Sequence, residues 1–103
     1  MKQLHIQKIE MSVVVPANSS ISDVTELSSV QAPTGADGSN IDALLSQIKS
    51  DKGVNLITDT VDSYQAAYEN LINGSSQAMV LNSAYSSLLE LSYDNYESNL
   101  KTI

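Results

Sequence analysis

The chain has 103 residues, of which 42% are hydrophobic, so it has the length of one domain and enough apolar residues for one modest core. Its formal net charge is −7, from 12 acidic residues against five basic ones, all of them lysine. Nucleic-acid-binding proteins neutralise phosphates with clustered lysine and arginine, so this balance argues against a nucleic-acid partner. The absence of cysteine excludes disulfides and thiolate sites, and no apolar run reaches the roughly 20 residues that a membrane-spanning helix needs.

The first third of the chain predicts two strands separated by a polar segment. Glu10–Pro16, EMSVVVP, is rich in β-branched residues and predicts a buried strand that ends at its proline. Within 20–27, apolar residues at three-residue spacing indicate one or two helical turns. Val30–Ala32 predicts a second, very short strand, closed by Pro33.

The segment 39–53 predicts an amphipathic helix. Its apolar residues recur at i, i+3, i+4 and i+7 from Ile41, which places them on one face. Ser39 and Asp42 have the spacing of a capping pair, and Gly53 is expected to end the helix.

The second half of the chain continues the alternation of strand and helix. Val54–Thr58 predicts a strand, 63–74 a helix with a left-handed glycine at its end, and Gln77–Ser83 another strand. A last helix begins near 83–89, and the tail from residue 93 is either a helical turn or a returning strand. One face of the helix in 63–74 gathers Tyr64, Ala67, Tyr68, Leu71 and Ile72.

This alternation across short connections predicts the α/β class, with a mainly parallel open sheet of about four strands and helices on its faces. Ligands of such sheets sit beyond the carboxyl ends of the strands, where helices begin. We therefore expect the loop 34–40 and the end of the strand at 82–83 to share one edge. Either the helix start holds an anion there, or the loop only starts a helix. The candidate ligand-binding residues are Thr34, Gly35, Ser39, Asn82 and Ser83.

Catalytic chemistry is not indicated. The single histidine, His5, cannot form a histidine-rich metal site and is expected at a strand edge or surface, and we expect no metal and no cofactor. Asp59 and Asp62 precede a helix, where carboxylates favour the helix dipole, so a capping role is preferred over acid–base work. No serine lies in a Gly-x-Ser-x-Gly elbow.

The five tyrosines divide into two groups. Tyr64, Tyr68 and Tyr85 occupy helix positions that predict packing in the core, with the hydroxyl in water. Tyr93 and Tyr96 lie in the tail and are candidates for sugar stacking or for the interface of a homodimer.

Three segments cover nearly the whole chain and resemble one family: MSVVVPANSSISDVTELSSVQAPTGADGSNIDALLSQIKS, SYQAAYENLINGSSQAMVLNSAYSSLLE and YDNYESNLKTI. They resemble the extracellular accessory domain of streptococcal capsule proteins of the LytR-CpsA-Psr family. The resemblance implies a membrane-anchored parent with a separate catalytic domain, on the outer face of the cytoplasmic membrane, that assembles capsular polysaccharide and attaches it to the cell wall. Residues 1–103 would then be a single noncatalytic accessory or regulatory domain and a fragment of that parent. Its partners would be the catalytic domain of the same chain and a cell-wall or capsule glycan.

A wider resemblance is to one lobe of the bacterial solute-binding proteins. The shared order includes D-x-x-x-L at Asp23–Leu27, a strand and small-residue loop at Val30–Thr34, and S-Y-x6-L-x-x-G at Ser63–Gly74. It implies that the loop after the second strand contacts ligand, through Thr34, Gly35 and Ser39. Two alternatives to the accessory role therefore stay open: a small-ligand or glycan-binding domain, and a homodimerisation module.

Overall fold

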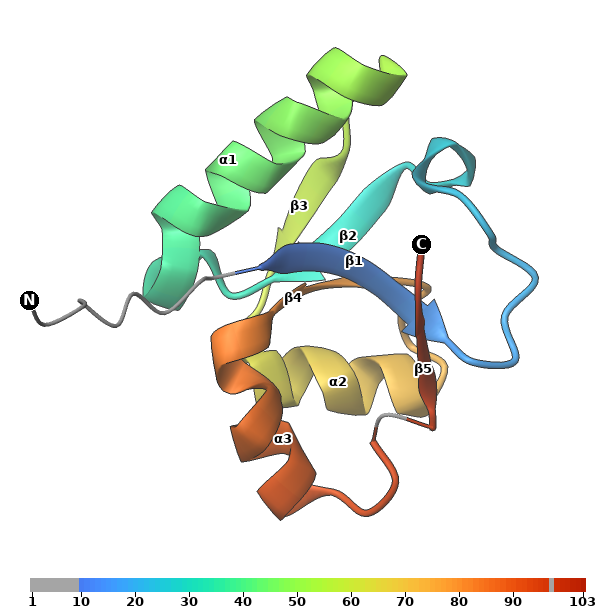
Figure 1. Cartoon of the computed structure of the whole chain (residues 1–103), viewed down its shortest axis with the longest axis vertical. Coiled ribbons are helices and arrows are strands. Elements are labelled where there is room, and N and C mark those ends of the chain that lie inside the picture. The colour runs from blue at the N-terminus through green and yellow to red at the C-terminus, as the bar shows by residue number, and fades with distance from the viewer. Residues whose placement is uncertain (1–9, 97) are drawn as a thin grey trace, which may run out of the picture.

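A computed structural model describes residues 10–96 and 98–103 of the chain (Figure 1). The elements are β1 (Met11–Pro16), the 3-10 turn η1 (Val24–Glu26), β2 (Ser29–Ala32), α1 (Thr34–Lys52), β3 (Ile57–Thr60), α2 (Tyr64–Ile72), β4 (Met79–Asn82), the 3-10 turn η2 (Ser83–Tyr85), α3 (Ser86–Ser92) and β5 (Leu100–Thr102).

The five strands form one open sheet in the order β3-β2-β4-β1-β5. β2 runs parallel to β3 and to β4, whereas β1 runs antiparallel to its two neighbours, β4 and β5. Four of the five strands therefore point the same way, and β1 opposes them (Figure 1). The predicted α/β class and mainly parallel open sheet are confirmed. The sheet has five strands where about four were expected, because the tail pairs as β5 with the outer edge of β1.

Helices cover both faces of the sheet, with α1 on one and α2 and α3 on the other (Figure 1). Successive side chains of β1 point to opposite faces of the sheet, and the core is divided into two clusters in the same way. Val13 and Val15 belong to an aliphatic cluster on the α1 face, and Val14 belongs to a tyrosine-rich cluster on the α2 face. Other members of the first cluster are Val24, Leu27, Val30, Ala32, Ile41, Ile48, Leu56, Ala78 and Val80. The second cluster also holds Tyr64, Ala67, Tyr68, Leu71, Met79, Leu89 and Tyr96.

Helix α1 begins five residues earlier than its expected capping residue, Ser39. Proline cannot donate a backbone hydrogen bond, but the Pro33 carbonyl accepts from the amides of Ala36 and Asp37 and so starts the first turn. Asp37 interrupts the helix with φ −143° and ψ 33°, which makes a kink between this first turn and the main body. α1 ends at Gly53, as predicted, and Gly53 adopts the left-handed conformation.

Two other boundaries differ from expectation. β3 begins at Ile57 rather than Val54, because its pairing with β2 runs from Ser29 opposite Ile57 to Ala32 opposite Thr60. In the segment 20–27 only the three residues of η1 are helical. Two apolar residues of predicted helices, Ile72 and Leu88, are 47% and 44% exposed.

The capping prediction for Asp59 and Asp62 is wrong. Asp59 lies within β3, and α2 is capped by Ser63, whose Oγ accepts a hydrogen bond of 3.1 Å from the Ala66 amide. A serine hydroxyl at the N-cap satisfies a free amide of the first turn directly, so α2 needs no carboxylate there. His5 lies outside the described residues.

Candidate functional site

The carboxyl ends of β2 and β4 meet the start of α1 at one edge of the sheet, and a single carboxylate joins them. Asp37 Oδ2 accepts hydrogen bonds from the Tyr64 hydroxyl at 2.6 Å and from Asn82 Nδ2 at 2.7 Å. Its Oδ1 accepts from Asn40 Nδ2 at 2.7 Å. These four residues, which we call the strand-end cluster, tie α1 to β4 and to α2.

The hydrogen bonds of the strand-end cluster keep Asp37 ionised. Partial burial raises the pKa of Asp37, but the donors from Asn82, Tyr64 and Asn40 lower it by more, so the net pKa lies below the usual value of 3.8. For Tyr64, burial first and the neighbouring Asp37 carboxylate second raise the pKa of the hydroxyl well above its usual value of 10.0. The cluster therefore carries one fixed negative charge over the neutral pH range.

The predicted convergence of the two loops is seen in the fold, and several of the predicted residues are engaged within it. Thr34 Oγ1 lies 3.2 Å from Thr60 Oγ1, which joins α1 to the end of β3. Asn82 is 2% exposed, and its side-chain oxygen accepts from the Ala84 amide. The Ser83 Oγ accepts from the Glu10 amide at 3.0 Å. Asn82 is therefore a buried structural residue whose side chain joins the end of β4 to Asp37 of α1.

Gly35, Ser39 and Ser83 are the exposed members of the predicted site. A Cβ added at Gly35 would meet no atom within 4 Å, so the first turn of α1 faces open space there. Gly35 in the first turn of α1 and Ser39 just after the kink are thus open to solvent, and the half-buried Thr34 lies beside them. The Asp37 charge beside them disfavours an anion and favours a neutral or cationic polar group.

Sequence reasoning missed Asp37 and the role of the Tyr64 hydroxyl. Tyr64 is 2% exposed, as its predicted core position requires, but its hydroxyl is bonded to Asp37 rather than to water. The Asp37 and Asn40 spacing gave a local signal, since an aspartate commonly bonds a side chain three residues on along a helix.

The tail tyrosines, which are the candidates for sugar stacking or for a homodimer interface, both pack against the ring of Tyr68. Tyr96 is 4% exposed, and its ring lies 6.3 Å from that of Tyr68 in an edge-on arrangement. Tyr93 is half-buried, with its ring 4.7 Å from that of Tyr68, and its hydroxyl donates to the Glu69 carboxylate. Burial raises the pKa of Tyr93 to about 12, with the help of Glu69. These rings close the α2 face of the core because the tail turns back to form β5.

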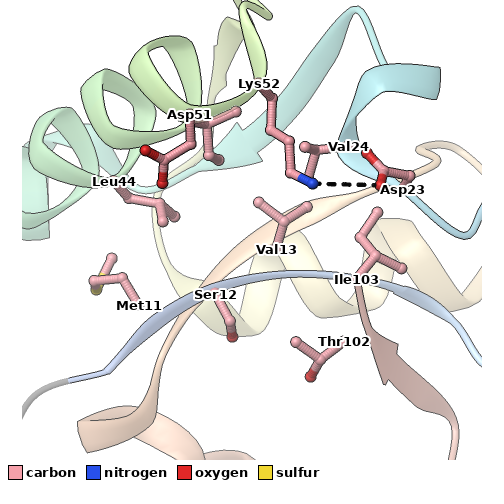
Figure 2. A pocket seen from close by; sticks show the side chains of 11 residues that line it. Met11, Ser12, Val13, Asp23, Val24, Leu44, Asp51, Lys52, Thr102 and Ile103 are labelled. Carbon is pink, nitrogen blue, oxygen red and sulfur yellow. Dashed lines mark ion pairs between the residues drawn. The ribbon is translucent and has the colours of Figure 1, made fainter.

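A pocket of about 440 Å³ lies on the other face of the sheet, between α1, η1, β1 and β5 (Figure 2). Figure 2 shows Leu44 and Asp51 directed from α1 toward β1, with Val13 and Ile103 directed toward them. The Lys52 Nζ lies 3.7 Å from Asp23 Oδ2 at one end. We call this space the α1-face pocket; it is also lined by Met11, Ser12, Val24, Ile48 and Thr102.

Two negative findings hold for residues 10–96 and 98–103. No group of three or more histidine, cysteine, aspartate or glutamate side chains is placed to hold a metal ion. None of the helices in this part of the chain is long and apolar enough to cross a membrane.

The fold is that of one lobe of a solute-binding protein. An ancestral arginine-binding protein bound to arginine has a TM-score of 0.56 at 20% identity, over 94% of this chain and 41% of its own. The second substrate-binding domain assigned to an amino acid ABC transporter of Streptococcus pneumoniae has 0.55 at 18% identity, over 93% and 40%. A periplasmic sulfonate-binding protein assigned to Methylobacillus flagellatus has 0.54 at 20% identity, over 90% and 27%. The chain thus spans less than half the length of these structures.

Family membership comes from the sequence. The profile of the DNA polymerase processivity factor family matches residues 1–81, which is most of the chain, and the chain belongs to that family. A comparison with well-characterised sequences finds no match.

The predicted LytR-CpsA-Psr resemblance is wrong. The family match is to processivity factors, and the structural likeness is to solute-binding lobes. The capsule-assembly role was inferred only from the LytR-CpsA-Psr resemblance and is rejected together with it. The second resemblance, to one solute-binding lobe, is confirmed at the level of the fold. The expected partners, a catalytic domain of the same chain, a glycan and a second copy, are tested by none of these findings and stay predictions.

Proposed function

We propose that this chain is a noncatalytic binding domain that supplies one half of a small-ligand site at the carboxyl ends of β2, β3 and β4. The observation that carries the proposal is the strand-end cluster, which fixes the first turn of α1 against these strand ends. In open α/β sheets this edge is where ligands bind. Because the cluster holds the edge rigid before any ligand arrives, little conformational freedom would be lost on binding.

The other half of the site would come from a second lobe or a partner. The solved structures with this fold are more than twice as long, and the first turn of α1 is open to solvent rather than enclosed. Thr34 and Ser39 supply hydroxyls to the ligand, and Asp37 supplies negative potential. The ligand would be a polar molecule without net negative charge, such as an amino acid.

An NMR titration tests this function. Amino acids, including arginine, are added while the amides of residues 34–40 and 82–85 are followed, and confined shifts there support the proposal. Thr34→Val removes one hydroxyl with little change in shape and should weaken binding about 2- to 10-fold, the usual net worth of a hydrogen bond. Thr25→Val, at an exposed position on η1, is the control and should leave affinity unchanged. Equal affinities for the two variants, or shifts elsewhere only, would reject the strand-end site.

Family membership supports a second candidate function, as an accessory protein of a DNA polymerase. If the chain acts in this way, we infer that it contacts the polymerase rather than DNA, because its 12 acidic residues oppose phosphates and it has no arginine to pair with them. Primer extension with a cognate polymerase would then give longer products in its presence. Tight binding to duplex DNA alone at low salt would contradict this inference.

The location of the protein in the cell separates the two candidates. A solute-binding role is proposed for the outside of the cytoplasmic membrane, whereas a polymerase accessory must work beside DNA. Protease accessibility of a tagged full-length protein in intact cells would decide between them: cleavage from outside supports the ligand-binding function and excludes the polymerase one.

A further inference from the structure

The α1 face of the sheet is only partly covered. Helix α1 packs over β2 and part of β1, and η1 closes one end, which leaves the α1-face pocket above β1 and β5 (Figure 2). Its volume of about 440 Å³ falls within the range of roughly 300–1,000 Å³ for small-molecule sites. It is lined by residues different from those of the strand-end cluster, so a ligand here would be independent of the proposed function.

The floor of the α1-face pocket is apolar. Val13 and Val24 are almost fully buried, whereas Met11, Leu44 and Ile103 are only partly buried against them. Ser12 and Thr102 also border the pocket, but Figure 2 shows their side chains directed away from α1. Apolar surface that remains wet in the free protein would be removed from water by an apolar ligand.

The rim of the α1-face pocket carries two carboxylates and one ammonium group. Lys52 is paired with Asp23, whose remaining oxygen accepts from the Thr25 amide. Asp51 accepts only a neutral donor, Gln47 Nε2 at 2.8 Å, and within the described part of the chain no cation lies at ion-pair distance from it. Among the described side chains of the rim, Asp51 therefore carries a negative charge that no cation compensates.

We propose that the α1-face pocket binds an organic ammonium ion with an apolar body, its chain on Val13, Leu44 and Ile103 and its ammonium group at Asp51. The charge of the rim selects this class. A carboxylate with the same body would meet Asp51 and would have to draw Lys52 away from Asp23. The net charge of −7 on the whole chain adds a general attraction for cations.

Three six-carbon probes of different charge test the ligand class. Hexylammonium, hexanol and hexanoate are titrated into the full chain while the methyl resonances of Val13, Leu44 and Ile103 are followed. Hexylammonium should bind about threefold to fivefold more tightly than hexanol, as expected for one exposed ion pair, and hexanoate should bind most weakly. Equal binding of hexylammonium and hexanoate, or no shift at millimolar concentrations, overturns the proposal.

The length of the probe tests the apolar floor. Each methylene that enters an apolar site tightens binding about fourfold. Hexylammonium has two more methylenes than butylammonium and should therefore bind more tightly by a factor of about 10 or more. If affinity does not rise with chain length, the ammonium is held by surface charge alone and the pocket is not a site.

Two variants of α1 test the place of the ammonium group. Asp51→Asn should remove the preference for hexylammonium over hexanol. Asp42→Asn makes the same change of charge at an exposed position nine residues away, on the opposite side of the helix, and is the matched control. Circular dichroism establishes that both variants fold. If both lower hexylammonium binding equally, or neither does, Asp51 does not bind the ligand and the proposal is wrong.

Discussion

The two faces of the sheet are built from different residues and end in different states. On the α2 face, two helices and the tail close over a core of packed tyrosines. The ring centroids of Tyr64 and Tyr85 lie 4.7 Å apart with the rings tilted by 45°, and those of Tyr68 and Tyr93 have the same separation and tilt. On the α1 face the core is aliphatic, one helix covers it, and a pocket remains. The comparison teaches that the two faces contribute differently to stability and to binding. The closed α2 face contributes more to the stability of the fold, and the open α1 face leaves apolar side chains accessible to a ligand.

The largest effect is expected on the closed face. Leu71 lies on the buried face of α2 and is 1% exposed. Leu71→Ala should lower the free energy of unfolding by about 4 kcal/mol, within the usual 2–5 kcal/mol for truncation of a buried leucine. Leu91→Ala, at 87% exposure on α3, is the control and should change it by less than about 0.5 kcal/mol. Urea unfolding measures both, and similar losses would remove the distinction between core and surface on this face.

A smaller loss is expected beside the α1-face pocket. Ile48 lines the pocket and is 9% exposed, so truncation enlarges a space that water already reaches rather than opening an empty cavity. Ile48→Ala should cost about 2 kcal/mol, and Ile41→Ala, at 0% exposure in the same helix, about 4 kcal/mol. If the two variants unfold at the same urea concentration, the α1 face is as closed as the α2 face.

The strand-end cluster links the two faces, and its stabilising effect depends on pH. Asp37→Asn loses hydrogen bonds to a charged acceptor and should cost about 1–2 kcal/mol at pH 7. Because the pKa of folded Asp37 lies below its usual 3.8, its contribution is complete above about pH 4 and disappears as the pH falls through the folded pKa.

The difference between the original chain and Asp37→Asn should therefore shrink below about pH 4. Asp23 and Glu26 also have lowered pKa values, mainly through backbone amide donors from Thr25 and Ser22 respectively. Their contributions are common to both proteins and cancel in the difference. Denaturant unfolding at several acidic pH values measures this difference. If the difference in free energy of unfolding does not change with pH, the hydrogen bonds assigned to Asp37 are contradicted.

The smallest effect is expected at the open edge. Gly35→Val places a side chain in empty space and should change the free energy of unfolding by no more than about 0.5 kcal/mol. Gly53→Val is the contrasting variant, because φ at Gly53 is +71° and a residue with a Cβ would pay roughly 1–2 kcal/mol there. Thermal unfolding measures the stability of both variants. A strong loss of stability in Gly35→Val would mean that α1 needs a glycine at this position for another reason.

Local pattern predicted most elements of this fold. The apolar stripe that begins at Ile41, the helix end at Gly53 and the buried valines of β1 all depend on neighbours within a few residues. The early start of α1 was missed, because three small or polar residues after Pro33 carry no periodic signal. The strand β5 was left undecided, because it forms only where the edge of β1 is free to pair with it.

The candidate site was predictable in place but not in detail. Parallel strands bring their carboxyl ends to one edge, and this rule was sufficient to place the start of α1 beside the end of β4. The role of Asp37 depends on Tyr64 and Asn82, which are 27 and 45 residues away along the chain. Contacts at such distances are set by the packing of whole elements, and a single sequence does not reveal them.

The antiparallel strand β1 has a consequence for the order in which the protein folds. It is the first of the described strands, yet its two partners, β4 and β5, are the last two of them, and the bonded pair Glu10 and Ser83 is 73 residues apart. During synthesis on the ribosome, one edge of β1 stays unpaired until β4 has been made, and the other until β5 has been made. The parallel pair β2 and β3, joined by α1, closes a much shorter loop and is expected to form first. Sheet completion around β1 would then be the late step, and a chain stalled before β4 would present an apolar strand to chaperones.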